Sequence, residues 1–175
     1  NEEKKIKNTA FKAELVKVLQ NEEALLYPFS KLTTVGFIDS PDKQIRIINW
    51  NIEQDDYSQE YSCFVLHLDK KKYYVNELID ISFGMPLHPT EIITSNEWYG
   101  ALYYKIIPVK KGSKMIYTIL GWDYNSSVSQ TKIIDAIYFT GSNIKLGSPI
   151  FKEEKETHKR IFYEYSKKVT MSLKY

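Results

Sequence analysis

The strongest constraint in this chain is an alternation between short β-prone runs and turn-forming segments. From residue 31 onward, runs rich in Ile, Val, Tyr and Trp are each followed by a segment of Asp, Ser, Gly, Pro or Lys. β-branched and aromatic side chains favour strands, whereas these segments favour turns. Fourteen Tyr, eight Phe and three Trp make up 14% of the chain and add to its β-propensity. The pattern predicts a mainly β fold.

Most neighbouring runs predict antiparallel hairpins, about ten strands in all. The run at 97–109 is apolar on both faces and therefore predicts a central strand. Residues 79–96 predict a crossing loop with a brief helical turn at 75–79. The predicted strand pairs are 31–38 with 44–52, 61–68 with 73–75, 97–109 with 115–122, 133–139 with 144–146, and 160–165 with 169–175.

Only the N-terminal segment has a helical period. Apolar residues recur at helical spacing between Glu2 and Leu26, and Pro28 ends the pattern because proline disfavours helix in the residue before it. One amphipathic helix over about 2–26 should therefore lie on a β meander over about 31–175. The expected fold is α+β, as a single domain at 1–175 forming a sandwich or an open barrel. A partial propeller stays open, although no fixed repeat supports it.

Composition excludes several classes of protein. The net charge of +2 is too small for a nucleic-acid footprint. Cys63 is the lone cysteine, so it forms no intrachain disulfide and no multi-cysteine zinc site. No apolar run reaches the roughly 20 residues of a membrane span. We expect no cofactor, metal or transmembrane segment. The chain starts at Asn1 without methionine and ends on a strand pattern, so we expect the native protein to extend at both ends.

Four segments resemble an uncharacterised family of exported, β-rich bacterial proteins. They are Ser40-Pro41-Asp42 followed by Arg46-Ile47-Ile48-Asn49-Trp50, the run Trp98 to Pro108, the run Tyr117 to Asp123, and the run Ile144 to Phe151. The resemblance covers roughly residues 30–175. It implies a cleaved signal peptide before Asn1 and a periplasmic, lipoprotein-anchored or extracellular location in the cell envelope. It implies no activity, substrate or catalytic residue.

Histidine and cysteine give no motif. His67 lies on a predicted strand, where a hydrogen-bonded structural histidine is expected. His88 lies in a loop between prolines, where functional residues are commoner, and His158 should be a surface residue. We expect Cys63 to be a buried thiol. No Gly-x-Ser-x-Gly, Walker loop or His-Glu-x-x-His motif occurs.

One carboxylate pair and four aromatic residues fall at the same predicted sheet edge. Glu97 and Asp123 stand at the ends of neighbouring strands, and a glycosidase needs two such carboxylates. The alternative for Asp123 is a turn-initiating residue. The aromatic residues form a candidate ligand platform for a sugar or a partner chain, with core packing as the alternative for the tryptophans. They are Trp98, Tyr99, Trp122 and Tyr124.

Lysines cluster at three predicted hairpin tips. Tip lysines usually aid solubility and block pairing between sheet edges. If several tips shared one end of the domain, they would form a basic rim able to meet anionic lipid or polysaccharide. The clusters are Lys70 to Lys72, then Lys110, Lys111 and Lys114, and finally Lys167 and Lys168.

These features support one leading hypothesis and two alternatives. The leading one is a noncatalytic secreted or cell-envelope binding module for a glycan or an envelope protein, with no role in nucleic-acid binding. The first alternative is a glycan hydrolase that uses Glu97 and Asp123 as acid and base. The second is a structural subunit of an envelope assembly, for which the final strand would supply an open edge.

Overall fold

The computed structural model describes residues 2–82, 89–124 and 126–175. The first sheet contains, in order, β1 (Gly36–Asp39), β2 (Ile45–Glu53), β3 (Gln59–Asp69) and β4 (Lys72–Leu78). The second contains, in order, β5 (Ile93–Thr94), β9 (Asn143–Leu146), β8 (Ser129–Thr140), β7 (Lys114–Asp123) and β6 (Leu102–Lys111), while β12 (Ile161–Ser166) also pairs with β8. β10 (Phe151–Glu153) and β11 (Glu156–His158) form a separate hairpin. The helices are α1 (Glu2–Leu19) and the 3₁₀ helices η1 (Glu22–Leu25) and η2 (Ser95–Glu97).

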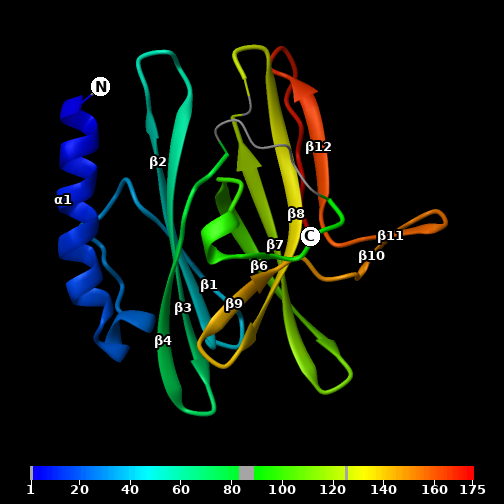
Figure 1. The fold of residues 1–175 in the computed structure, drawn as a ribbon, viewed down its shortest axis with the longest axis horizontal. Helices are drawn as coiled ribbons and strands as arrows, with labels where there is room; N and C mark the ends of the chain where they lie inside the picture. Colours follow the sequence, from blue (N-terminus) through cyan, green and yellow to red (C-terminus); the bar gives the residue numbers. More distant parts are fainter. Residues whose placement is uncertain (1, 83–88, 125) are drawn as a thin grey trace.

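The three layers are α1, the first sheet and the second sheet, and α1 lies only against the first (Figure 1). Neighbouring strands within each described sheet are antiparallel. The two sheets face each other without closing into a barrel. This confirms the mainly β, α+β prediction and selects the sandwich.

The layer between α1 and the first sheet is built from alternate residues of β2 and β3. Trp50 and Phe64 point toward α1 and pack there with Leu15 and Leu19. Phe11 meets the Trp50 indole edge-on, with ring centroids 5.1 Å apart. The Trp50 indole N–H donates to Asn8 Oδ1 at 2.9 Å, so the buried polar atom has a partner. Trp50 is therefore a core residue of this layer.

The opposite face of the first sheet packs against the second sheet. Cys63 and Val65 of β3 face Ile119 of β7 and Ile137 of β8 in this second core. Cys63 is completely buried, and burial raises the pKa of its thiol, so the predicted structural thiol is confirmed.

The helix ends seven residues earlier than predicted. α1 stops at Leu19, and the backbone of Asn21 is extended, with φ −84° and ψ 127°. The Asn21 side chain accepts a hydrogen bond from the Glu23 N–H and caps η1. Asparagine is a strong N-cap residue, so it starts a new helix rather than continuing the first.

Three strand predictions were wrong in the second sheet. The run at 97–109 is not central, because its strand, β6, is the edge strand of that sheet. Its apolar start, Trp98 to Ala101, is a buried loop rather than a strand. β12 pairs with β8, and residues 169–175 form no strand. The Tyr104 hydroxyl instead donates to the Leu173 carbonyl at 3.1 Å and ties this C-terminal segment to β6.

Two further differences are local. The helical turn predicted at 75–79 is strand through Leu78, because β4 stays paired with β3 as far as Cys63. The short strands β5, β10 and β11 were not predicted, since two or three residues give no periodic pattern. His88 lies outside the described residues.

His67 is a structural residue, as predicted. It has no exposed surface, and its Nε2 lies 3.0 Å from the Gly141 carbonyl oxygen. Its ring stacks on Phe139 with centroids 3.8 Å apart. Burial lowers the pKa of His67, against a smaller opposing effect of the Gly141 carbonyl.

The lowered pKa of His67 predicts a pH dependence of stability. The unfolded chain binds a proton near pH 6.5, whereas the folded chain keeps this imidazole neutral. The free energy of unfolding therefore has its full value above the pKa of this histidine in the unfolded chain, and it decreases as the pH falls below that pKa. Between about pH 7.5 and pH 5, urea denaturation should show a larger loss for the wild type than for His67→Gln. Equal losses in the two proteins would contradict this prediction.

Candidate functional site

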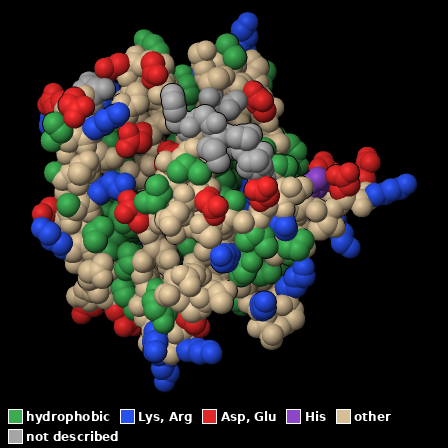
Figure 2. All heavy atoms as spheres, in the orientation of Figure 1, with side chains coloured by type: hydrophobic (Ala, Val, Ile, Leu, Met, Phe, Trp, Pro, Cys, Tyr) green, Lys and Arg blue, Asp and Glu red, His purple; other side chains and the backbone are tan. Residues whose placement is uncertain are grey.

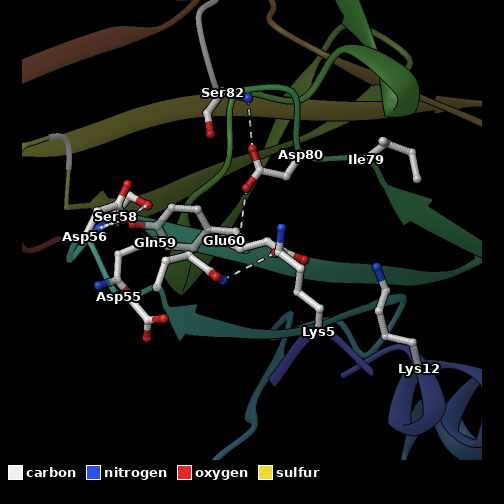
Figure 3. A pocket seen from close by; sticks show the side chains of 12 residues that line it. Lys5, Lys12, Asp55, Asp56, Ser58, Gln59, Glu60, Ile79, Asp80 and Ser82 are labelled. Atoms are coloured by element: carbon white, nitrogen blue, oxygen red, sulfur yellow. Dashed lines mark hydrogen bonds between the residues drawn. The ribbon is translucent and has the colours of Figure 1, made fainter. Parts of the chain in front are cut away.

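A polar groove of about 690 Å³ opens between α1 and the turn that joins β2 to β3 (Figure 3). We call it the polar groove. One wall is the N-terminal part of α1, the other is the β2–β3 turn, and the segment after β4 closes the space between them. Its lining residues are Lys5, Lys12, Gln54, Asp55, Asp56, Ser58, Gln59, Glu60, Tyr61, Ile79, Asp80 and Ser82.

The β2–β3 turn is held by short hydrogen bonds. Asp56 Oδ1 accepts from the Ser58 N–H at 3.0 Å and from the Ser58 hydroxyl at 2.6 Å. These bonds stabilise the carboxylate and lower the pKa of Asp56. Tyr57 lies between them with φ 65°, and its side chain is 64% exposed. The turn therefore places an ionised carboxylate in the groove lining, next in sequence to the exposed Tyr57, which is not itself a lining residue.

Asp80 forms the rear of the groove and has a structural role. Its Oδ2 accepts from the Tyr61 N–H and its Oδ1 from the Ser82 N–H, both at 2.9 Å. Gly100, with φ +71°, lies so close that an added Cβ would sit 2.8 Å from Asp80 Oδ1. Both carboxylate oxygens already accept hydrogen bonds, so Asp80 fixes the shape of the groove (Figure 3).

The helix wall presents two lysines with different surroundings. Lys12 Nζ lies 2.6 Å from Glu77 Oε1, and both side chains are partly buried. Lys5 is exposed, and within the described chain no carboxylate forms an ion pair with it. Figure 3 shows Lys5 and Lys12 on the helix side, across from Asp55, Asp56 and Ser58. Lys5 therefore offers a cationic donor to a ligand, opposite carboxylate acceptors.

The predicted carboxylate pair has local structural roles on both sides. The Glu97 carboxylate accepts from the Thr94 N–H at 2.9 Å and the Thr94 hydroxyl at 2.7 Å, completing a capping box of η2. These bonds lower the pKa of Glu97. Asp123 accepts from the Tyr61 hydroxyl at 2.8 Å. The Tyr124 N–H donates to the same Tyr61 oxygen at 2.9 Å. Each carboxylate thus stabilises a chain segment.

The four predicted platform residues divide between core and surface. Trp98 has no exposed surface, and its N–H donates to the Tyr103 hydroxyl at 2.8 Å. Tyr99 is 8% exposed, so neither ring presents a face to solvent. Trp122 and Tyr124 are half-buried. The Lys167 ammonium lies 3.2 Å from the centroid of the Tyr124 ring and occupies one of its faces. Trp122 is the predicted aromatic that keeps a candidate binding surface.

A second cluster of titratable groups is completely enclosed. Asp135 and Arg160 are 0% and 1% exposed, and Arg160 Nε donates to Asp135 Oδ2 at 3.0 Å. The Tyr99 hydroxyl donates to the same oxygen at 2.8 Å, and it also contacts the Tyr103 hydroxyl at 2.9 Å. Burial raises the pKa of Asp135, and the Arg160 charge opposes that rise. Because a substrate has no access to it, this cluster is a structural network.

The polar groove was not predicted from the sequence. Asp55, Asp56 and Ser58 have the composition of an ordinary turn, and turns of this kind are common on protein surfaces. Their position opposite Lys5 depends on how α1 packs on the sheet. The one available sequence signal was Tyr57, an aromatic residue inside a polar turn.

Comparisons with protein-family models, curated proteins and solved structures found no match to this chain. None of the described helices is both long enough and apolar enough to span a lipid bilayer. Among the described residues, no group of three or more His, Cys, Asp or Glu side chains could hold a metal ion. Function must therefore be inferred from the geometry of the polar groove.

Proposed function

We propose that this domain is a noncatalytic binding module of an exported or cell-envelope protein and that its polar groove binds a glycan. The observation that carries the proposal is the groove itself, about 690 Å³ in volume and lined mainly by hydrogen-bonding side chains. Ligand sites typically have volumes of roughly 300–1,000 Å³. The groove is therefore of a size for a short oligosaccharide.

The lining suits a polyhydroxylated ligand. Each sugar hydroxyl can donate to a carboxylate such as Asp56 and accept from an ammonium or amide group such as Lys5 or Gln59. Carboxylates and lysines lie on opposing walls, so a bound glycan meets acceptors on one side and donors on the other. The exposed Tyr57 stands in sequence between the lining residues Asp56 and Ser58, and its ring offers an apolar surface for the C–H face of a sugar that extends beyond the groove.

The geometry gives less support to a hydrolase. A glycosidase acid needs a raised pKa so that it stays protonated, together with a second carboxylate on the other side of the bond. Hydrogen bonds lower the pKa values of Asp56 and Glu97. For the assembly-subunit alternative, the argument from an open final strand is lost because 169–175 forms no strand.

A glycan array provides the test. The double variant Lys5→Gln and Tyr57→Asn removes one charge and one ring, and asparagine tolerates the positive φ of residue 57. The best glycan for the wild type should bind the double variant at least roughly tenfold more weakly, because a hydrogen bond to a charged group and a ring contact are lost. Trp122→Ala is the matched control, and its binding should equal that of the wild type.

Two outcomes would overturn the proposal. If Trp122→Ala abolishes binding while the double variant retains it, the site lies on the second sheet. If mass spectrometry shows that the wild type shortens the bound glycan, the domain is a hydrolase.

A further inference from the structure

Four hairpin turns, β1–β2, β3–β4, β6–β7 and β8–β9, lie at the end of the sandwich opposite the polar groove. β3 begins at the groove turn and ends at the β3–β4 turn, so the two turns lie at opposite ends of one strand. His67, near the end of β3, contacts the Gly141 carbonyl in the β8–β9 turn. The Tyr117 hydroxyl of β7 donates to Asp42 of the β1–β2 turn at 2.9 Å. These contacts bring both sheets together at this end.

Lysines dominate this end, which we call the basic end. Figure 2 shows Lys and Arg side chains at the lower edge of the view, with some Asp and Glu side chains beside them, where Figure 1 places the β3–β4 and β6–β7 turns. The turn lysines are Lys43, Lys70, Lys71, Lys72, Lys110, Lys111 and Lys114. Lys167 and Lys168, after β12, belong to a different part of the chain.

Two of the nearby carboxylates, Asp39 and Asp42, have partners, and Asp69 of the β3–β4 hairpin adds one negative charge beside the lysines of that turn. Asp39 contacts Arg46 Nε at 2.6 Å and Lys43 Nζ at 3.4 Å. Asp42 accepts from the Ser40 hydroxyl at 2.5 Å as well as from Tyr117. The lysines of the β3–β4 and β6–β7 turns therefore leave a positive surface.

The β3–β4 turn keeps lysines at strained positions. Lys70 and Lys71 have φ 49° and 68°, where Asn-Gly is the favoured pair. At the neighbouring β6–β7 and β8–β9 turns, the positive-φ residues are glycines, Gly112 at 62° and Gly141 at 61°. Lysine side chains in left-handed conformations are disfavoured, and such outliers concentrate at functional sites. The positive φ angles of Lys70 and Lys71, together with the gathering of lysines, therefore indicate that the positive charge of the basic end has a functional role.

The β6–β7 hairpin adds apolar side chains to the lysines. Val109 and Met115 are 36% and 42% exposed, and they lie on opposite faces of the hairpin tip, because Val109 pairs with Ile116 and Met115 with Lys110. Beside the hairpin lies a recess of about 330 Å³. Its lining residues are Lys111, Lys114, Ile116, Tyr138, Ser148 and Pro149. Lys111 Nζ donates to the Pro149 carbonyl at 3.1 Å, and the recess beside Lys114 is large enough for one phosphate group.

We propose that the basic end docks on a membrane surface that contains anionic phospholipids. The lysines face the phosphate layer, Val109 and Met115 enter the interface, and the recess takes one lipid phosphate. Lysine clusters near an anionic surface attract it electrostatically, and exposed apolar side chains add a hydrophobic contribution. An anionic polysaccharide would use the charges but would leave Val109 and Met115 without a role. In this arrangement the polar groove, at the opposite end of β3, points away from the membrane.

Vesicle co-sedimentation tests the docking surface. The probes are vesicles of phosphatidylcholine alone and of phosphatidylcholine with phosphatidylglycerol. The charge variant replaces Lys70, Lys71, Lys110 and Lys114 by Gln. The matched control replaces Lys7, Lys155, Lys168 and Lys174 by Gln, which removes the same number of exposed charges away from the basic end.

The wild type and the control should bind the anionic vesicles in low salt and the neutral vesicles much more weakly. The charge variant should bind the anionic vesicles at least roughly tenfold more weakly than the wild type. Met115→Ser should weaken binding by a smaller factor, and high salt should reduce binding by the wild type. The charge variant should bind glycan as the wild type does, so this test is independent of the proposed function.

Several outcomes would overturn the inference. Equal loss in the charge variant and the control would mean that only the net charge matters. Equal binding to both kinds of vesicle would exclude a role for anionic lipid. Binding to a soluble anionic polysaccharide without binding to anionic vesicles would assign the basic end to a polysaccharide instead.

Discussion

Replacing Arg160 by alanine should lower the free energy of unfolding by about 3–5 kcal/mol. Arg160 Nε contacts the completely buried Asp135 carboxylate, and its other nitrogens donate to the Glu91 and Leu146 carbonyls at 2.9 and 3.0 Å. Removing the guanidinium leaves a buried carboxylate and two carbonyl groups without that donor. It also releases the contacts that link the segment before β5 and the end of β9 to the residue that precedes β12. Chemical denaturation followed by circular dichroism measures the loss.

Two further variants decide whether the loss comes from the unpaired charge. The double variant Asp135→Leu and Arg160→Met removes both charges, and hydrophobic replacement of a buried pair is often neutral. It should therefore be more stable than Arg160→Ala. Lys155→Ala, at an exposed position, should change the free energy of unfolding by less than roughly 0.5 kcal/mol. A loss of similar size in Lys155→Ala and Arg160→Ala would contradict the assignment.

Replacing Trp98 by alanine should lower the free energy of unfolding by about 3–5 kcal/mol. The indole has no exposed surface and packs in the core with Tyr61, Tyr99 and Tyr103. The substitution opens a large cavity between the sheets and takes a donor from the Tyr103 hydroxyl. Circular dichroism is the measurement, since the change removes a fluorophore.

Trp122→Ala is the matched control for Trp98. The Trp122 side chain is half-buried, and its N–H donates to Gln130 Oε1 at 3.3 Å. Its loss should cost roughly 1 kcal/mol, the centre of the distribution for point substitutions. If the two tryptophans cost the same, Trp98 is not the core residue that its burial indicates.

The parts of the fold that were predicted depend on local signals. Hairpins such as β3–β4 and β6–β7 combine β-prone runs with turn chemistry inside one short segment. The helix end was missed because Asn21, a capping residue, lies inside an apolar pattern that continues to Leu26. β6 was taken for a central strand because Trp98 and Ala101 are buried as loop residues. Periodicity cannot tell a buried loop from a buried strand.

The candidate site was missed for a related reason: local sequence patterns do not show which distant residues meet in the fold. Glu97 and Asp123 were singled out by their places in the hairpin, but local partners, Thr94 and Tyr61, bind them. The polar groove depends on residues 5 and 54–60, which are far apart in sequence and meet only because α1 lies on the first sheet. The sequence alone does not predict this tertiary contact.

Glycan binding by the polar groove is tested most directly by an NMR titration. Backbone amide shifts of ¹⁵N-labelled wild-type protein would be followed while the best glycan from the array is added. We predict that the shifts concentrate at residues 54–60, at Lys5 and at Asp80. Shifts concentrated at Trp122 and its neighbours on the second sheet, with residues 54–60 unchanged, would contradict the proposed function.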